Sequence, residues 1–133
     1  MFVDSCFCID LMREEYSQSP GPASAKLKQL SETPLHMSVF ALCELQGGAR
    51  LSRNSRRELR IVEALSRRVT VVQTDARFPE VFSRLQVALR KQGKPIPTMD
   101  LLIGSMAVRH GLPLVTSDTR HYRLIPGLVV ETY

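Results

Sequence analysis

The stretch MDLLIGSMAVRHGLPLVTSDTRHY, residues 99–122, decides the fold of this chain. Its apolar residues predict a buried helix that Gly111 ends, followed by a buried strand over residues 114–116. Asp100 stands at the start of that helix, and Asp118 comes just after the strand. Carboxylates beside a core cost free energy unless they have partners. The positions of these two aspartates therefore indicate a structural or functional role.

The same alternation of strand and helix extends over the rest of the chain. Short apolar segments predict strands at residues 1–3, 35–37, 69–72, 114–116 and 128–130. Helical spacing predicts helices over residues 5–15, 23–31, 39–48, 55–67, 76–92 and 99–110. This order predicts an α/β/α sandwich around a short, mainly parallel sheet of four to five strands. We expect a single domain over residues 1–133.

Particular residues mark three of the helix boundaries. Ser38 and Thr98 precede apolar helical segments, and we predict that each is the N-cap of its helix. The helix after Ser38 is predicted to end near Gly47 and Gly48, because glycine disfavours a helix interior.

Composition and charge narrow the class of protein. The 44% of hydrophobic residues suffice for a core, and a formal net charge of +5 fits a nucleic-acid partner. No apolar run approaches the roughly 18 residues of a membrane-spanning helix, and the N-terminus lacks the basic region of a signal peptide. An odd number of cysteines, three, favours reduced thiols. We therefore expect a cytoplasmic protein without a membrane partner.

Four acidic residues lie where a solvated surface does not explain them. Asp4 directly follows the first strand, Glu44 interrupts the apolar helix VFALCEL, and Asp100 and Asp118 flank the stretch quoted above. Ligands of open α/β sheets bind outside the carboxyl ends of the strands, where Asp4 and Asp118 are expected. Taken singly, Asp4 could be a helix cap, Asp100 a favourable charge at a helix start and Asp118 an Asx-turn.

Together, the four acids predict a metal site. Carboxylates that share one edge of a sheet repel each other unless a divalent cation neutralises them. Ligands that are all oxygen favour Mg²⁺ or Mn²⁺. Such an ion supports hydrolysis of a phosphodiester bond, because it activates water and stabilises charge on the phosphate.

Several arginines and one histidine are further candidates for contacts with a substrate or a partner. Arg53, Arg56, Arg57 and Arg60 fall at i, i+3, i+4 and i+7, which places them on one face of a helix. They are interpreted as a phosphate-binding stripe, as a solvated face, or as a surface that a protein partner covers. His121 follows Asp118 closely and is a candidate contact to substrate.

Four segments, taken in order, carry a resemblance to a known family. They are Phe2-Val3-Asp4-Ser5, the segment from Ser38 to Glu44-Leu45, the segment from Pro97 to Asp100, and Leu114-Val115-Thr116-Ser117-Asp118. The chain resembles PIN-domain proteins, and within them the VapC-type toxin ribonucleases of toxin–antitoxin pairs. The resemblance covers nearly the whole chain and extends to the tail HYRLIPGLVVETY.

The resemblance implies an activity, a site and partners. By it, Asp4, Glu44, Asp100 and Asp118 would be catalytic and bind Mg²⁺ or Mn²⁺, with Ser5 and Thr116 as supporting hydroxyls. The substrate would be RNA, and Arg53, Arg57 and Arg60 are the candidates to bind it. A cognate antitoxin would hold the toxin inactive, and a homodimer is left open.

One departure from the family pattern is Cys6, where the family usually has a polar residue two positions after the first aspartate. Without a polar side chain at position 6, the metal ligands would have less support, so we expect weaker activity or a preference for Mn²⁺. The alternative function is a non-catalytic PIN-like module that binds RNA or protein. Retention of all four acids argues against that alternative.

Overall fold

The computed structural model describes residues 1–133 and contains one sheet of five parallel strands. In chain order the strands are β1 (Phe2–Val3), β2 (His36–Ser38), β3 (Thr70–Val72), β4 (Leu114–Val115) and β5 (Val130–Glu131). Their order across the sheet is β3-β2-β1-β4-β5. The chain thus extends the sheet from β1 in one direction and then returns to extend it in the other. The change of direction falls between β1 and β4, where open parallel sheets bind ligands.

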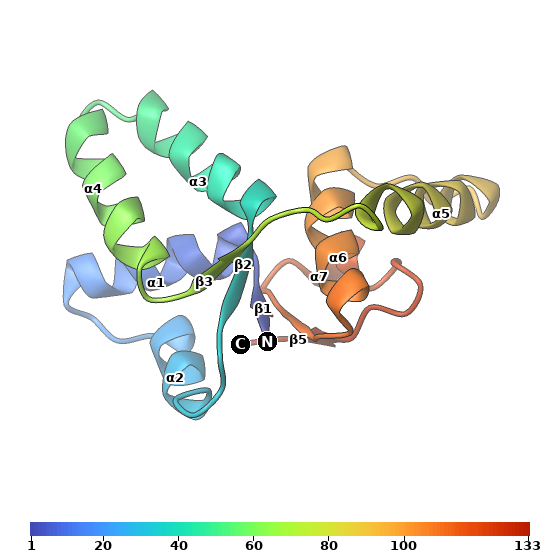
Figure 1. Ribbon diagram of the computed structural model, residues 1–133. Helices are drawn as coiled ribbons and strands as arrows, with labels where there is room; N and C mark the ends of the chain where they lie inside the picture. Colours follow the sequence, from blue (N-terminus) through green and yellow to red (C-terminus); the bar gives the residue numbers. More distant parts are fainter.

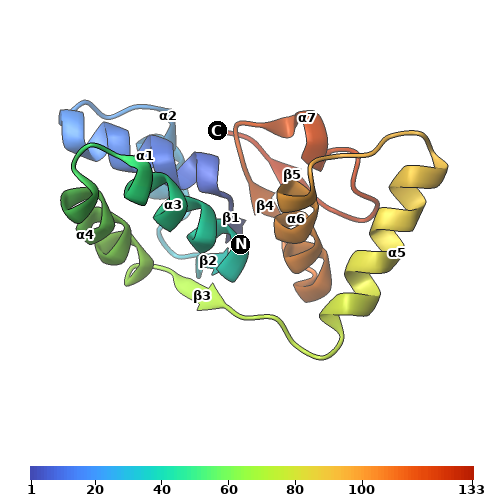
Figure 2. The same cartoon turned by 90° about the horizontal axis from the view of Figure 1, so that it is seen from above.

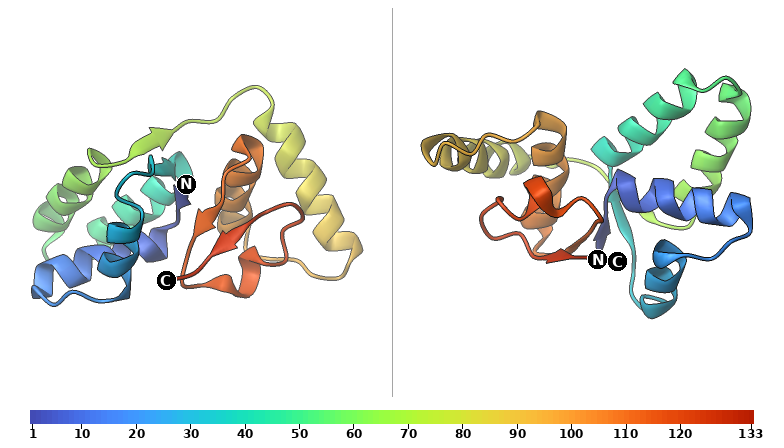
Figure 3. Two further views of the ribbon diagram at one scale, coloured as in Figure 1. Left: turned by 90° about the horizontal axis from the view of Figure 1, so that it is seen from below. Right: turned by 180° about the vertical axis from the view of Figure 1, so that it is seen from behind.

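Seven helices cover the two faces of the sheet. They are α1 (Ser5–Ser17), α2 (Pro22–Gln29), α3 (Val39–Leu51), α4 (Ser55–Ser66), α5 (Phe78–Lys91), α6 (Thr98–His110) and α7 (Thr119–Tyr122). Helices α1 to α4 lie on one side of the strands, and α5 to α7 lie on the other (Figures 1 and 3). Helix α5 packs on the outer side of α6 (Figure 2). The predicted α/β/α sandwich around a parallel sheet is confirmed.

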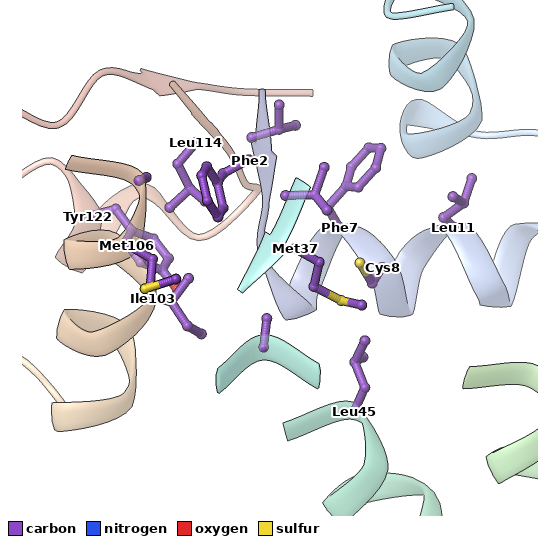
Figure 4. Packing of buried hydrophobic residues seen from close by; sticks show 14 of the residues in the cluster. Phe2, Phe7, Cys8, Leu11, Met37, Leu45, Ile103, Met106, Leu114 and Tyr122 are labelled. Atoms are coloured by element: carbon purple, nitrogen blue, oxygen red, sulfur yellow. The ribbon is translucent and has the colours of Figure 1, made fainter. Parts of the chain in front are cut away.

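Both faces of the central strands are buried in apolar side chains. Phe2 pairs in register with Leu114, and both lie beside Ile103 and Met106 of α6 (Figure 4). Met37 of β2 points to the opposite face, where it lies among Phe7, Cys8 and Leu45. Because both faces are covered, β1 and β4 contain consecutive apolar residues rather than an alternation of apolar and polar ones. That explains why such short strands were recognisable in the sequence.

The predicted end of α3 at Gly47 and Gly48 is wrong, because the helix continues to Leu51. Each glycine costs about 1 kcal/mol relative to alanine in a helix interior. Leu45 and Ala49 of the same helix are buried, and the packing of α3 against α4 and α1 outweighs that cost. The prediction that Ser38 caps α3 is confirmed, since its hydroxyl accepts a hydrogen bond from the Ala41 amide at 3.1 Å.

The start of α6, the start of β5 and the presence of α7 also differ from the sequence predictions. Pro97, not Thr98, is the N-cap of α6, because its extended backbone places its carbonyl to accept from the Leu101 amide. Strand β5 begins at Val130, two residues later than predicted, because Gly127 with φ 77° forms a turn before it. Helix α7 was not predicted at all. None of the helices is long and apolar enough to cross a membrane.

Candidate active site

Asp4 lies at the carboxyl end of β1 and is almost fully buried. Its Oδ1 accepts a hydrogen bond from the Phe7 amide at 2.8 Å, so it caps α1, and its Oδ2 accepts one from the Thr116 hydroxyl at 2.5 Å. Burial raises the pKa of Asp4 to about 6, although these donors favour the ionised form. The charge of Asp118 raises the pKa of Asp4 further. The cap suggested by the sequence is therefore present, together with a contact across the sheet.

Thr116 connects Asp4 to Asp118. Its hydroxyl donates to Asp4 and accepts a hydrogen bond from the Asp118 amide at 2.9 Å. Asp118 is exposed, and its Oδ1 accepts from the Arg120 amide at 3.3 Å, which makes Asp118 the N-cap of α7. Thr116 lies just after β4, the neighbour of β1, so this connection crosses the point where the sheet changes direction.

Glu44 reaches the same region from α3. Its Oε2 accepts a hydrogen bond from the Ser5 hydroxyl at 2.7 Å. Ser5 is the first residue of α1 and follows Asp4 directly, so the contact brings Glu44 to the carboxyl end of β1. Ser5 and Thr116, both predicted as supporting hydroxyls, therefore each donate to a different candidate carboxylate.

Asp100 lies half-buried in the first turn of α6, as predicted. Its Oδ2 lies 2.7 Å from Nδ1 of His121 in α7. The sequence pointed to His121 only as a substrate contact. Its spacing from Asp118 gave no sign that it reaches Asp100, because that contact depends on how α7 packs against α6.

The charges of all four acids act on two neighbouring side chains. Burial raises the pKa of Tyr122, and the charges of Asp4, Asp100 and Glu44 raise it further. Burial raises the pKa of Cys6 to about 12, and the charges of Asp4, Asp118, Asp10 and Glu44 contribute. These effects weaken with distance. Hydrogen bonds link Asp4 to Asp118 through Thr116, and they bring Glu44 to Ser5 and Asp100 to His121, so the four candidate acids lie around the carboxyl ends of β1 and β4.

The fit of a metal ion depends on its coordination. No three His, Cys, Asp or Glu side chains are placed so that they could hold one ion between them. Mg²⁺ does not require such a cage, since it keeps several waters and is usually bound through one or two carboxylates. Oxygen donors of the kind gathered here are its preferred ligands. The residues thus fit a largely hydrated Mg²⁺ or Mn²⁺ better than a closed protein cage.

Tyr133 is a further neighbour of the site that the sequence did not single out. Its hydroxyl donates to Asp10 Oδ2 at 2.9 Å, and its ring packs edge-on against Phe7 at 5.1 Å between centroids. Burial raises the pKa of this phenol, and the carboxylate of Asp10 raises it further. The only sign in the sequence was the resemblance of the tail, which assigns no role to this tyrosine.

The predicted helical stripe of four arginines is wrong at one end. Asn54 caps α4, whose first residue is Ser55, so Arg53 lies in the turn before the helix. Arg56, Arg57 and Arg60 are on α4 and line a surface hollow of about 520 Å³. The guanidinium of Arg57 stacks on the Tyr16 ring at 4.4 Å.

Arg57 also borders a groove that leads to the candidate site. The groove lies between α1, α3 and α4 and has a volume of about 490 Å³. Glu44 lines one part of it, and apolar side chains form much of its surface: Ile9, Met12, Leu45, Ala49, Ile61 and Val62.

Comparison with known proteins decides the family. The model of the PIN domain family matches residues 1–125. The chain belongs to the PIN domain family. Among its relatives in that family, the tRNA(fMet)-specific endonuclease VapC of Shigella flexneri is 28% identical over 98% of this chain and 96% of its own length. Ribonuclease VapC1 of Haemophilus influenzae strain R2866 is 31% identical over 71% of this chain and 70% of its own length.

Solved structures of other proteins agree with the observed fold. VapBC2 from Rickettsia felis, bound to a DNA fragment from its promoter, superposes with a TM-score of 0.90 at 22% identity, over 99% of this chain and 97% of that one. VapBC-1 from nontypeable Haemophilus influenzae superposes with a TM-score of 0.86 at 26% identity, over 98% of this chain and 96% of that one. The predictions of a PIN domain and of a VapC-type ribonuclease are confirmed at the level of the family.

Proposed function

We propose that this PIN-domain protein is a Mg²⁺- or Mn²⁺-dependent endoribonuclease and the toxin of a toxin–antitoxin pair. The observation that carries the proposal is the position of Asp4, Glu44, Asp100 and Asp118 around the carboxyl ends of β1 and β4, which is supported by the hydrogen bonds of Thr116, Ser5 and His121. Three of these carboxylates accept a hydrogen bond from another element of the fold: Asp4 from Thr116, Glu44 from Ser5 and Asp100 from His121. Fixed carboxylates of this kind need no reorganisation when they bind a cation.

The residues of this chain have distinct tasks in the proposed reaction. The four carboxylates would hold the ion directly or through its waters, and a bound ion would supply an activated water and neutralise charge on the phosphate. Thr116 and the Phe7 amide orient Asp4, while Ser5 orients Glu44. Arg53, Arg57 and Arg60 bind phosphates of the RNA outside the reacting centre, because exposed guanidinium groups suit phosphate oxygens.

RNA cleavage by the purified protein tests this proposal. A tRNA(fMet) transcript, chosen after the Shigella relative, and an unrelated RNA are incubated with Mg²⁺, with Mn²⁺ and with EDTA. We expect cleavage only with a metal, and at least a hundredfold loss in Asp100→Asn. Glu80→Gln on remote α5 is the matched control and should cleave as wild type.

The outcomes separate the two candidate functions. Cleavage in EDTA, or at the wild-type rate by Asp100→Asn, would remove this metal site from the mechanism. RNA binding without cleavage under any condition would support the non-catalytic module. Growth arrest on expression of the wild type, and none with Asp4→Asn, is the result expected of a toxin.

The antitoxin docks in the groove between α1, α3 and α4. The structural relatives include VapBC complexes, which supports a protein partner. The apolar surface of the groove suits an apolar segment, while Arg13 and Arg57 at the groove suit acidic residues of that segment. Glu44 lines the same groove, so a docked segment lies beside the proposed site and blocks it.

Two adjacent glycines of α3 provide a matched test of this docking site. A Cβ at Gly47 or at Gly48 meets nothing within 4 Å, so the fold tolerates side chains at both positions. Only Gly48 lines the groove. Gly48→Arg should therefore abolish co-purification with a co-expressed cognate antitoxin, while Gly47→Arg should preserve it. Equal co-purification of both variants would place the antitoxin elsewhere.

The cysteines support a proposal about the cellular compartment of the protein. Cys6, Cys8 and Cys43 are all free, and Cys43 is exposed. Exposed free thiols persist in a reducing environment, which supports a cytoplasmic protein.

A further inference from the structure

The carboxylate of Asp100 differs from the others in the source of its hydrogen bond. Asp4 and Glu44 accept from hydroxyl groups, whereas Asp100 Oδ2 lies 2.7 Å from His121 Nδ1. Both side chains of this pair are about one-quarter exposed, at 25% for His121 and 22% for Asp100. A contact that is shielded in this way holds its partners more firmly than one on the open surface.

The packing of α7 on α6 creates this contact. Gly104 lies four residues after Asp100, on the same face of α6. A Cβ at Gly104 would clash with the Cδ1 atom of Ile125 and would lie 3.5 Å from the Tyr122 ring. The absence of a side chain at Gly104 thus lets the segment from α7 to Ile125 approach α6. Tyr122 and Ile125 are both buried in that contact, and His121 beside them then lies over the first turn of α6.

The start of α7 is tied to the same site. Asp118 caps the helix through the Arg120 amide, and the Asp118 amide donates to Thr116. Helix α7 has only four residues, so its two ends have little freedom to move independently. His121 is therefore held from one side by the residues of the site and from the other by the packing of Tyr122.

The imidazole can donate to Asp100 in either charge state. A neutral histidine with its proton on Nδ1 donates from that nitrogen, and a protonated histidine also does. The contact therefore orients the carboxylate whether or not the ring is charged. It uses Oδ2 and leaves Oδ1 of Asp100 without a hydrogen-bond partner in the protein.

We infer that His121 is a positioning residue for Asp100, an inference that rests on the proposed metal-dependent function. Its Nδ1–H group fixes the rotamer of the Asp100 carboxylate, so that Oδ1 faces the bound ion or its waters. Partners of this kind, which hold a ligand rather than the ion, change metal affinity or activity by about 10- to 100-fold when they are removed.

Three substitutions separate positioning from simple packing. His121→Asn keeps a donor near the place of Nδ1, His121→Gln moves the donor to the place of Nε2, and His121→Phe keeps a ring without a donor. His110→Asn is the control, because His110 is an exposed histidine of α6 whose ring lies 5.6 Å from Phe2. Circular dichroism melting in EDTA shows which variants fold as the wild type does.

Two readouts are measured for each folded variant. The first is the dissociation constant for Mn²⁺, from the rise of the melting temperature with metal concentration, which requires no catalysis. The second is cleavage of RNA, separated into kcat and KM. We expect His121→Phe to lose about tenfold or more in Mn²⁺ affinity and in kcat with little change in KM. His121→Gln should resemble it, while His121→Asn and His110→Asn should stay within about threefold of wild type.

The outcomes distinguish this inference from the function on which it rests. If wild type neither cleaves RNA nor is stabilised by Mn²⁺, the proposed function and the role of His121 fail together. If wild type does both and His121→Phe matches it, only the role of His121 fails. If the Asn variant, which keeps a donor near the place of Nδ1, loses as much Mn²⁺ affinity as the Phe variant, that donor does not support the metal site and the positioning role is overturned.

Discussion

The hydroxyl of Thr116 donates a hydrogen bond to Oδ2 of Asp4, two residues that lie 112 positions apart in the sequence. Thr116 follows β4 and Asp4 follows β1, so the bond links the two strands between which the sheet changes direction. It also gives a buried carboxylate a donor from a second element of the fold. The same hydroxyl accepts from the Asp118 amide, so one threonine organises two of the four candidate acids.

Thr116→Val should destabilise the protein by about 1–3 kcal/mol, because it leaves Oδ2 of the buried Asp4 and the backbone amide of Asp118 without a partner. Valine keeps the shape of threonine, so little of this loss would come from packing. Urea unfolding in EDTA at pH 7 measures the change. Thr116→Ser keeps the hydroxyl and is the control, and equal stability of the two variants would show that the bond contributes nothing.

Stability should depend on pH through Asp4. The pKa of Asp4 is raised from 3.8 to about 6 by burial, so between these values the folded protein binds more protons than the unfolded chain. The contribution of Asp4 to stability is complete below about pH 4 and is lost as the pH rises through 6. We expect a loss on the order of 3 kcal/mol across this window in EDTA. Asp4→Asn should lack this component of the pH dependence, and parallel pH profiles of the two proteins would contradict the prediction.

The sequence was informative where one physical effect dominates. Buried parallel strands must be short and apolar, which made Phe2-Val3 and Leu114-Val115 recognisable. Because the carboxyl ends of parallel strands share one edge, the residues that follow these strands were expected to meet there, as Asp4 and Thr116 do. Ser38 was recognisable as a cap because the side-chain hydrogen bond is local.

The sequence was uninformative where packing between distant elements decides. Gly47 and Gly48 disfavour a helix locally, but α3 continues through them because Leu45 and Ala49 are buried against its neighbours. Helix α7 has four residues, too few for a hydrophobic period to be visible. The contact of His121 with Asp100 follows from that helix and from the close approach at Gly104, so no local pattern could indicate it.

Gly104→Ala should destabilise the protein. Overpacking should cost about 1–3 kcal/mol. The higher helix propensity of alanine should offset about 1 kcal/mol of this cost. The new Cβ would clash with Cδ1 of Ile125, and valine at position 125 lacks that atom. Ile125→Val alone should cost about 0.5–1.5 kcal/mol. The double variant should lose less stability than the sum of the losses of the two single variants, which a double-mutant cycle of urea unfolding measures. Additive losses would show that Gly104 is not required for the approach of α7.

Neutralising the arginines of α4 should weaken RNA binding and flatten its dependence on salt. Each phosphate contact with a single strand contributes about 0.7 to the slope of log affinity against log salt concentration. Arg57→Gln or Arg60→Gln should each reduce the slope by about that amount, measured with a non-cleaving Asp100→Asn background. Arg84→Gln on α5, on the opposite side of the sheet, should leave the slope unchanged. An unchanged slope for all three would leave α4 as a solvated or protein-binding surface.

The last prediction concerns the effect of the acids on stability without metal. The four carboxylates lie closer together in the folded protein than in the unfolded chain, and their mutual repulsion therefore lowers the free energy of unfolding. The repulsion is visible in the effect of Asp118 on the pKa of Asp4. A cation that binds only the folded protein opposes the repulsion and stabilises the fold by mass action.

Asp100→Asn removes one of these charges, and the amide oxygen of asparagine can still accept from His121. In EDTA the variant should therefore melt at or above the temperature of wild type, although Asp100 is half-buried beside the core. In millimolar Mg²⁺ or Mn²⁺, wild type should gain stability and the variant should gain less. Both differences should be on the order of 1 kcal/mol, since partly solvated charges interact at a high effective dielectric. Melting curves of both proteins in EDTA, Mg²⁺ and Mn²⁺ measure them. Indifference of wild type to all three conditions would mean that the acids bind no metal, and Asp4 and Asp118 would then act only as helix caps.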